Sequence, residues 1–341
     1  MDLFALTRAL VDIESVTGNE KGVSTFVLER LAEMAARHGG RAEPIAVEPN
    51  RFNVFAHWGE PVVTLSTHLD TVPPFFKSGE DEATIRGRGS CDAKGILAAM
   101  MGAAERLLSE GVRNFGLLFL VGEERNSAGA IAAARTPRGS RFLINGEPTE
   151  NKLAIGSKGA LRYQLTARGR MAHSAYPQLG ESAIDKLLDV LAEVRRIPLP
   201  ADAVLGPCTL NIGTLSGGRA PNVVADLAQS DIMFRLVGDA APLREAVLRA
   251  AGGRVEAKEV LSTPAMRLGE FAGLPTTVVS FTTDIPFLGE AWGKPFLIGP
   301  GSIHDAHTQD EAVPKGQLRE AVGIYSQMVR SLLASGGAQR A

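Results

Sequence analysis

Apolar residues in the first 157 positions follow two alternating patterns. Stripes at i, i+3 and i+4 predict amphipathic helices within 3–13, 26–34 and 96–108. Between them lie short continuous apolar runs, which are typical of strands buried on both faces of a parallel sheet. The alternation predicts an α/β layer, in which helices flank a mixed, mostly parallel sheet.

A different pattern occupies residues 159–268. Polar and apolar residues first alternate, as in a half-buried strand, and a helical stripe follows. The later predicted elements are strands near 208–215 and 224–237, a helix near 241–251 and a strand near 254–261. The resulting order, β-α-β-β-α-β, matches the ferredoxin-like split βαβ sandwich.

The first pattern returns near residue 270, so the second pattern interrupts the first. We expect an outer domain of residues 1–158 and 269–341 and an inserted lid domain of residues 159–268. A sheet with helices on one face leaves its other face or an edge strand available, which is a common route to a dimer. We therefore expect a homodimer that forms through the lid.

Composition excludes several classes of partner. The chain is 45% apolar and 22% charged, as in soluble globular proteins, and its net charge is −2. No dense Lys/Arg cluster indicates nucleic acid, and no run reaches the ~18 apolar residues of a membrane span. The N-terminus lacks the features of a secretory signal, and Cys91 and Cys208 lie far apart. We expect a cytoplasmic protein without a disulfide framework.

Side chains that can ligate metal ions follow the ends of the apolar runs. Imidazole and carboxylate groups bind Zn²⁺ and similar divalent ions. In open α/β sheets, such groups meet where the strands end at their carboxyl edge. The sequence therefore predicts a metal-dependent hydrolase, with a candidate set of His68, Asp70, Asp92, Glu123, Glu124, Glu147 and His307.

This set has the right size for a pair of ions. A two-ion site needs a bridging carboxylate, two terminal ligands for each ion and one free base. Glu123 and Glu124 cannot both face one ion from a regular strand, but in a loop one can ligate while the other reaches a bound water. Asp70 is two residues after His68, so it can accept the other ring N–H of that histidine.

Each residue also has a purely structural interpretation. A Glu-Glu pair is usually solvated, and a single histidine after a strand is often structural. Asp92 could cap the helix that begins after it. We prefer the metal site because all of these segments end apolar runs at the same predicted sheet edge.

Two longer motifs resemble those of a known family. Residues 66–73, Ser-Thr-His-Leu-Asp-Thr-Val-Pro, resemble its His-x-Asp-x-Val-Pro motif, and residues 87–95, Gly-Arg-Gly-Ser-Cys-Asp-Ala-Lys-Gly, resemble its Gly-Arg-Gly-x-x-Asp-x-Lys-Gly motif. The family is that of the co-catalytic dizinc amidohydrolases and peptidases, which includes acetylornithine deacetylase, succinyl-diaminopimelate desuccinylase, aminoacylase and carboxypeptidase G. The matching segments that complete the order are Glu123-Glu124, Gly146-Glu147-Pro148-Thr149 and Ala306-His307.

The resemblance covers nearly the whole chain and implies a two-domain enzyme with a lid that mediates dimerisation. It implies that Asp92 bridges two ions, that His68 and Glu147 complete one site, and that Glu124 and His307 complete the other. The expected ions are zinc, although the same ligands also accept cobalt or manganese.

The resemblance implies further roles around these ligands. Glu123 is the general base and later acid, and Asp70 orients the histidine ligand. The family often has a cis peptide after the bridging aspartate. It often has a second glycine where this chain has Ile96, a departure that we expect to affect helix packing. Spacing does not choose between His304 and His307, but the pattern Ala-His-x-x-Asp-Glu favours His307.

The predicted lid, together with Lys158 just before it, supplies four more candidates. His173 is either an ordinary loop histidine or the family's lid histidine, which faces the active site of the dimer partner and stabilises an oxyanion. Asn222 and Arg235 match substrate-contact positions, and with Lys158 they could bind an α-carboxylate. Alternatively, Lys158 is solvated and Arg235 pairs with an aspartate on its own sheet.

The expected reaction is hydrolysis of the amide bond of an N-acyl amino acid by a hydroxide shared between the two ions, as in acetylornithine deacetylase or succinyl-diaminopimelate desuccinylase. A dipeptidase or carboxypeptidase acting on short peptides would use the same metal site. A non-catalytic binding protein on this scaffold would lack Glu123 or a ligand, and none is missing. The acyl group stays open at this point.

Overall fold

The computed structural model describes residues 2–337, and the chain divides into two compact units. The first unit contains the chain up to Ile155, Leu268–Thr277 and the segment from Thr283 onward. The second unit contains Gly156–Arg267 and the short segment Val278–Thr282. Met1 and residues 338–341, which the predicted outer domain includes, lie outside the described residues.

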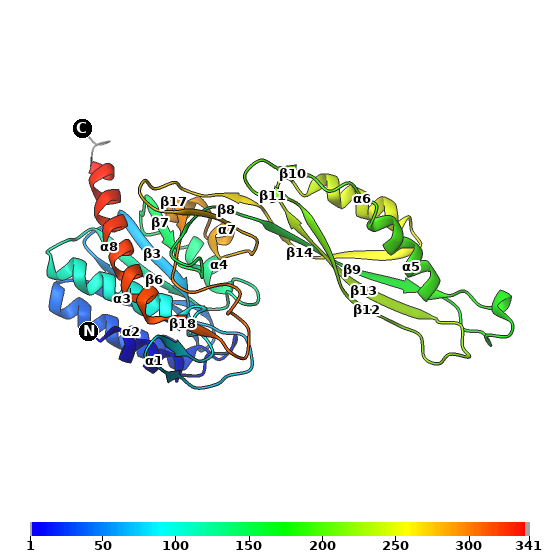
Figure 1. Cartoon of the computed structure of the whole chain (residues 1–341), viewed down its shortest axis with the longest axis horizontal. Helices are drawn as coiled ribbons and strands as arrows, with labels where there is room; N and C mark the ends of the chain where they lie inside the picture. Colours follow the sequence, from blue (N-terminus) through cyan, green and yellow to red (C-terminus); the bar gives the residue numbers. More distant parts are fainter. Residues whose placement is uncertain (1, 338–341) are drawn as a thin grey trace. The chain divides into compact units, whose positions relative to one another are not determined.

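Most of a nine-stranded sheet belongs to the first unit (Figure 1). The four central strands are parallel, and the flanking strands pair antiparallel to them or to one another. This arrangement confirms the predicted fold class, a mixed and largely parallel sheet with helices. In spatial order the strands are β1 (Arg41–Glu48), β2 (Arg51–Trp58), β6 (Phe115–Leu120), β3 (Val63–His68), β7 (Phe142–Asn145), β17 (Lys294–Leu297), β8 (Leu153–Ser157) and β15 (Met266–Arg267), with β16 (Thr276–Val279) also beside β8.

Helices pack on both faces of this sheet because its central strands are apolar on both sides. In β6, Leu117 and Phe119 belong to one buried cluster, whereas Leu118 and Leu120 belong to another. The first cluster includes side chains of α1 (Leu3–Val11), α2 (Lys21–His38), α3 (Lys94–Ser109) and α8 (Lys315–Gly337). The second includes side chains of α4 (Ala128–Ala134), α7 (Ile285–Leu288) and the 3₁₀ turn η2 (Gly289–Trp292).

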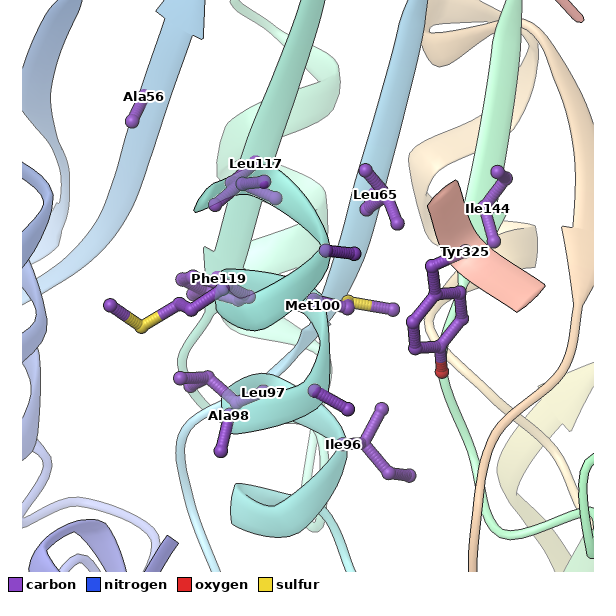
Figure 2. Close-up of a cluster of buried hydrophobic side chains, with 14 of the residues drawn as sticks. Ala56, Leu65, Ile96, Leu97, Ala98, Met100, Leu117, Phe119, Ile144 and Tyr325 are labelled. Atoms are coloured by element: carbon purple, nitrogen blue, oxygen red, sulfur yellow. The ribbon is translucent and has the colours of Figure 1, made fainter. Parts of the chain in front are cut away.

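Helix α3 forms the centre of the larger cluster (Figure 2). Its fully buried Ile96, Leu97 and Met100 lie over the strands, and Tyr325 of α8 lies beside them. Burial of one such side chain stabilises the fold by about 1.5–3 kcal/mol. Ile96 fits because its neighbour Gly146 has no side chain, since a Cβ there would lie 2.4 Å from Cγ2 of Ile96. The departure at Ile96 therefore affects helix packing, as expected.

The second unit has the predicted β-α-β-β-α-β order. Its four strands form an antiparallel sheet in the order β12-β13-β9-β14. Both helices cover the same face of this sheet and bury apolar side chains against it (Figure 1). The elements are β9 (Gly159–Arg168), α5 (Ala183–Val194), β12 (Thr209–Gly217), β13 (Leu227–Leu236), α6 (Ala241–Ala251) and β14 (Val255–Thr263).

Smaller elements complete the two units. They are a three-stranded sheet of β4 (Gly79–Glu80), β5 (Thr84–Arg86) and β18 (Ala312–Pro314), a hairpin of β10 (Ala201–Asp202) and β11 (Gly206–Pro207), and the 3₁₀ turn η1 (Pro177–Leu179). Among the helices within residues 2–337, none is both long and apolar enough to cross a bilayer.

Candidate metal centre

The parallel strands of the first unit bring ligand-type side chains to one sheet edge. β3 lies between β6 and β7, and the register pairs His68 with Leu120 and Ser66 with Asn145. His68 therefore ends its strand beside the point where the loop to Glu123 and Glu124 begins. Glu147 follows directly after β7 at the same carboxyl edge, as expected for an open α/β sheet.

His68 has both ring nitrogens against oxygen acceptors. Its Nδ1 lies 3.0 Å from the backbone oxygen of Asp70, and its Nε2 lies 2.9 Å from Oδ1 of Asp92. A carbonyl oxygen only accepts, so Nδ1 carries the proton, and the lone pair of a neutral ring faces the carboxylate at Nε2. Such a contact needs either a second proton or a cation between the two atoms. The residues present therefore fit a divalent ion at this position.

The raised pKa values of two histidines reflect the same requirement for positive charge. Burial would lower the pKa of His68, but the carboxylates of Asp70 and Asp92 outweigh burial and hold this pKa well above its usual value. His307 behaves similarly, because contacts with Asp92 and Glu124 raise its pKa to about 10. At both rings the neighbouring carboxylates favour a positive charge, which a bound divalent ion would also supply.

Asp92 lies between the two histidines. Its Oδ1 faces His68, and its Oδ2 lies 3.3 Å from Nε2 of His307. The same Nε2 lies 2.9 Å from Oε1 of Glu124, while Oε2 of Glu147 lies 3.9 Å from Nε2 of His68. Ligand atoms of His68, Asp92 and Glu124 lie within 4.8 Å of one another. Two carboxylate oxygens that face two separate histidines have the arrangement of a bridging ligand.

Backbone geometry at these ligands is unusual. The peptide bond between Asp92 and Ala93 is cis, which confirms the expectation from the family resemblance. His307 has a φ of 64°, in the left-handed region that residues with a side chain rarely adopt. His304, the alternative histidine of this segment, is exposed, and its backbone N–H is bonded to the Ser302 hydroxyl. The structure thus places His307, and not His304, against the other ligands.

Glu123 lies beside the ligands without taking part in their contacts. Within residues 2–337, no group donates a hydrogen bond to its carboxylate, although its backbone N–H donates to Asp70. Burial raises its pKa well above the usual value, and the charge of Glu147 raises it further. A carboxylate that has no hydrogen-bond donor and a raised pKa binds a proton more tightly than an ordinary glutamate, which suits a group that accepts and later releases a proton.

Asp70 contacts His68 differently from the prediction. Its carboxylate oxygen lies 3.6 Å from Nδ1 of His68, so the ring N–H instead donates to the backbone oxygen of Asp70. The carboxylate accepts the backbone N–H groups of Glu123 and Glu124, at 3.1 and 3.2 Å, and the hydroxyl of Thr17, at 2.8 Å. Asp70 therefore fixes the histidine through its backbone and the Glu-Glu turn through its side chain.

Glu311 is a buried carboxylate that the sequence interpretation did not select. One of its oxygens accepts the backbone N–H groups of Gly89, Cys91 and Asp92, at 2.9–3.1 Å. The other pairs with the guanidinium of Arg88. Because Glu311 follows His307 by four residues, it links the segment of one ligand to the loop of another. Arg88 and Glu311 both lie in the quoted motifs, but they are 223 positions apart, and no local pattern indicates that they pair.

A second buried charge supports the same loop from the other side. Lys94, at the start of α3, donates from its Nζ to the backbone oxygen of Ile13, at 2.6 Å. Burial lowers its pKa to about 7. Lys94 is part of the Asp-x-Lys-Gly motif, and its contact explains that motif position as an anchor between α3 and the segment after α1.

The four predicted lid residues all lie in the second unit or at its start, and no hydrogen bond or ion pair joins them to one another within residues 2–337. His173 is exposed, and its Nδ1 accepts the backbone N–H of Ala175 at 3.1 Å. A neutral His173 ring therefore carries its proton on Nε2 and presents it as a donor. Asn222 is exposed, and its backbone oxygen accepts the N–H of Ser174.

Arg235 and Lys158 differ in whether their charge has a partner. Arg235 is half-buried and forms no hydrogen bond or ion pair in the described part of the chain. It therefore pairs with neither Asp231 nor Asp239. Asp231 instead pairs with Arg162. Burial lowers the pKa of Arg235. Lys158 is buried rather than solvated, and its Nζ donates to the backbone oxygen of Pro207 at 2.7 Å. Arg235 is therefore the member of this set with a free cationic group.

Comparison with known proteins identifies relatives of the whole chain. A model of peptidase family M20/M25/M40 matches residues 64–331. A peptidase M20 domain-containing protein of Schizosaccharomyces pombe is 38% identical over 96% of this chain and 84% of that protein. A probable carboxypeptidase of Aspergillus niger is 38% identical over 95% of this chain and 88% of that protein. The structure of an M20 family metallo-carboxypeptidase from Sulfolobus solfataricus superimposes with a TM-score of 0.80 at 14% identity, over 97% of this chain and 99% of that one.

We expect Glu311→Ala to destabilise the fold strongly. The substitution leaves a buried guanidinium without its counter-charge, and removing one partner of a buried pair costs about 3–5 kcal/mol. Urea denaturation of the metal-free protein measures this loss. Glu311→Gln keeps an acceptor and should lose less. The control Glu110→Ala, at a partly exposed ion pair with Arg330, should change the free energy of unfolding by less than about 1 kcal/mol. A loss that small for Glu311→Ala would contradict its role in holding the loop.

Proposed function

Because the chain belongs to peptidase family M20/M25/M40 and is a hydrolytic metallopeptidase, we propose that it cleaves the amide bond on the nitrogen of an amino acid with a free α-carboxylate. The first candidate substrate is an N-acyl amino acid, as for acetylornithine deacetylase or succinyl-diaminopimelate desuccinylase. The observation that carries this proposal is Asp92, whose two oxygens face two histidines beside the free carboxylate of Glu123.

The proposed centre holds two divalent ions, with Asp92 between them. His68 and Glu147 are the remaining ligands on one side, and Glu124 and His307 on the other. Zinc is the ion that we propose, since it favours imidazole and carboxylate ligands in catalytic sites. When bound, such ions lower the pKa of water and polarise the carbonyl group that the water attacks.

Glu123 would perform the proton transfers. It takes a proton from the attacking water and gives it to the nitrogen of the leaving amine. Its raised pKa favours the second step, because a weakly acidic carboxyl group holds the proton until the amine forms. The hydrogen bond from the Glu123 backbone N–H to Asp70 holds the backbone that carries this carboxylate.

A carboxypeptidase is the second candidate, and the named relatives favour it. The Aspergillus niger relative is a probable carboxypeptidase, and the Sulfolobus solfataricus structure is a metallo-carboxypeptidase. Both candidate substrates place a free α-carboxylate next to the scissile amide. They differ only on the acyl side, where the group is either a simple acyl chain or the rest of a peptide.

A substrate panel tests the proposal. We expect protein stripped by a chelator to be inactive and to regain activity with zinc, cobalt or manganese. With ions restored, we compare the rates of hydrolysis of two sets of compounds. The first set contains N-acetyl amino acids, N-succinyl amino acids and short peptides with a free α-carboxylate. The second contains the same compounds with that carboxylate amidated. Glu123→Gln should retain the ions, measured by metal content, but lose about 10²–10⁴-fold in kcat. Equal hydrolysis of the amidated compounds would refute the requirement for a carboxylate.

Arg235 is the group that we propose to bind the substrate carboxylate, because a guanidinium offers two parallel donors to a carboxylate. We expect Arg235→Ala to raise KM by about tenfold or more, which corresponds to a lost charged hydrogen bond of about 1.5–3 kcal/mol. The matched control is Arg162→Ala, since Arg162 already pairs with Asp231 on the same sheet. Steady-state kinetics on both variants, with circular dichroism as a check of folding, decides the point. An unchanged KM in folded Arg235→Ala would exclude this role.

We further propose that the second unit mediates a homodimer and that His173 stabilises the oxyanion in the partner subunit. Its exposed ring and its Nε2 proton support this role. Loss of one such donor reduces turnover by about 10²–10³-fold. We expect His173→Ala and Glu123→Gln homodimers to be nearly inactive, and mixed dimers to recover activity because one of their two sites is intact. Purified heterodimers with two different tags measure this. Heterodimers as inactive as the parents would show that His173 acts within its own subunit, and a fully active His173→Ala homodimer would show that it has no such role.

A further inference from the structure

Asp284 is a buried acid that the roles above do not use. It immediately precedes α7, and α7 packs against α4, which directly follows the turn that carries Glu123 and Glu124. The Asp284 side chain is 1% exposed. Neither of its carboxylate oxygens has a hydrogen-bond or ion-pair partner within residues 2–337.

The charges around Asp284 are mostly of its own sign. The groups that act on it electrostatically include His68, Asp70 and Glu124, and Asp284 in turn raises the pKa of Glu123 and of Glu147. Burial raises the pKa of Asp284 to about 7, although the nearby Ser127 hydroxyl favours its charged form. An ionised carboxylate without a partner is costly in the protein interior, so such groups are normally paired or bound to metal. Within residues 2–337, His68 acts on this carboxylate electrostatically, but no cation forms an ion pair with it.

We propose that Asp284 belongs to the metal centre and supplies a further carboxylate, directly or through one water, to the cation on the His68–Glu147 side. This inference rests on the proposed two-ion centre. It follows from burial and the missing ion-pair partner, because Asp284 is as buried as His68 and Glu147 and interacts electrostatically with both. A cation at this place gives the orphaned carboxylate the counter-charge that the chain itself lacks.

Metal affinity and folding stability are expected to change in different directions when the charge of Asp284 is removed. Asp284→Asn keeps the shape of the side chain and removes its charge. We expect this variant to bind one of the two ions about 10–100-fold more weakly, as is usual when a supporting group of a metal site is lost. The metal-free variant should be at least as stable as metal-free wild type, because it no longer buries an uncompensated charge. Calorimetric titration with zinc and thermal unfolding with and without zinc measure both effects. The control is Glu290→Gln, an exposed acid in the same segment.

The outcomes distinguish this inference from the proposed function. If wild type binds two ions and Asp284→Asn binds both with unchanged affinity, the inference is wrong and the metal centre stands. If wild type binds no ion, the proposed function itself fails. Should the variant not fold, a crystal structure of zinc-loaded wild type decides the question. Asp284 oxygens on the ion, or on a water bound to it, would support the inference, and a side chain turned away from both ions would overturn it.

Discussion

Concentrated negative charge at the carboxyl edge of one sheet is the constraint on which the rest of this structure depends. His68 shows it most directly, because its ring lies between a carbonyl oxygen and a carboxylate and can satisfy both only as a cation or with one. His307 has the same requirement for positive charge, because its Nε2 faces the other carboxylate oxygen of Asp92. A fold that brings several acids together at a buried edge is stable only with bound protons or metal ions, and this requirement connects folding to catalysis.

The chain distributes part of this charge over backbone N–H groups. Asp70 accepts the N–H groups of Glu123 and Glu124, and Glu311 accepts those of three residues in the loop that ends at Asp92. Hydrogen bonds of this kind stabilise a buried carboxylate and at the same time hold the backbone that carries the ligands. Asp70 and Glu311 therefore resemble each other in function, and each lies in a motif that also carries a candidate histidine ligand.

The sequence predicted what depends on local pattern and missed what depends on long-range contact. His68, Glu123, Glu124 and Glu147 were found because each ends or closely follows a short, largely buried strand. The hairpin of β1 and β2 was missed, because β1 is an edge strand with one buried residue, Ile45, and its apolar run, Ile45-Ala46-Val47, is short. Glu311 acts on residues more than 200 positions away, and no spacing rule predicts such a contact.

Asp284 marks the limit of the pattern argument most clearly. It lies three residues after the strand-like segment Thr277-Val278-Val279-Ser280-Phe281, so it too follows a predicted strand. The family motifs instead accounted for a complete set of ligands, and a complete set leaves no reason to look for another acid. Only burial without a partner distinguishes Asp284 from the many acids that simply follow strands. A buried polar group without a partner is thus a stronger indication of function than a position in a sequence pattern. The pattern indicates only where a side chain can lie, whereas the missing partner indicates which kind of group would bind it.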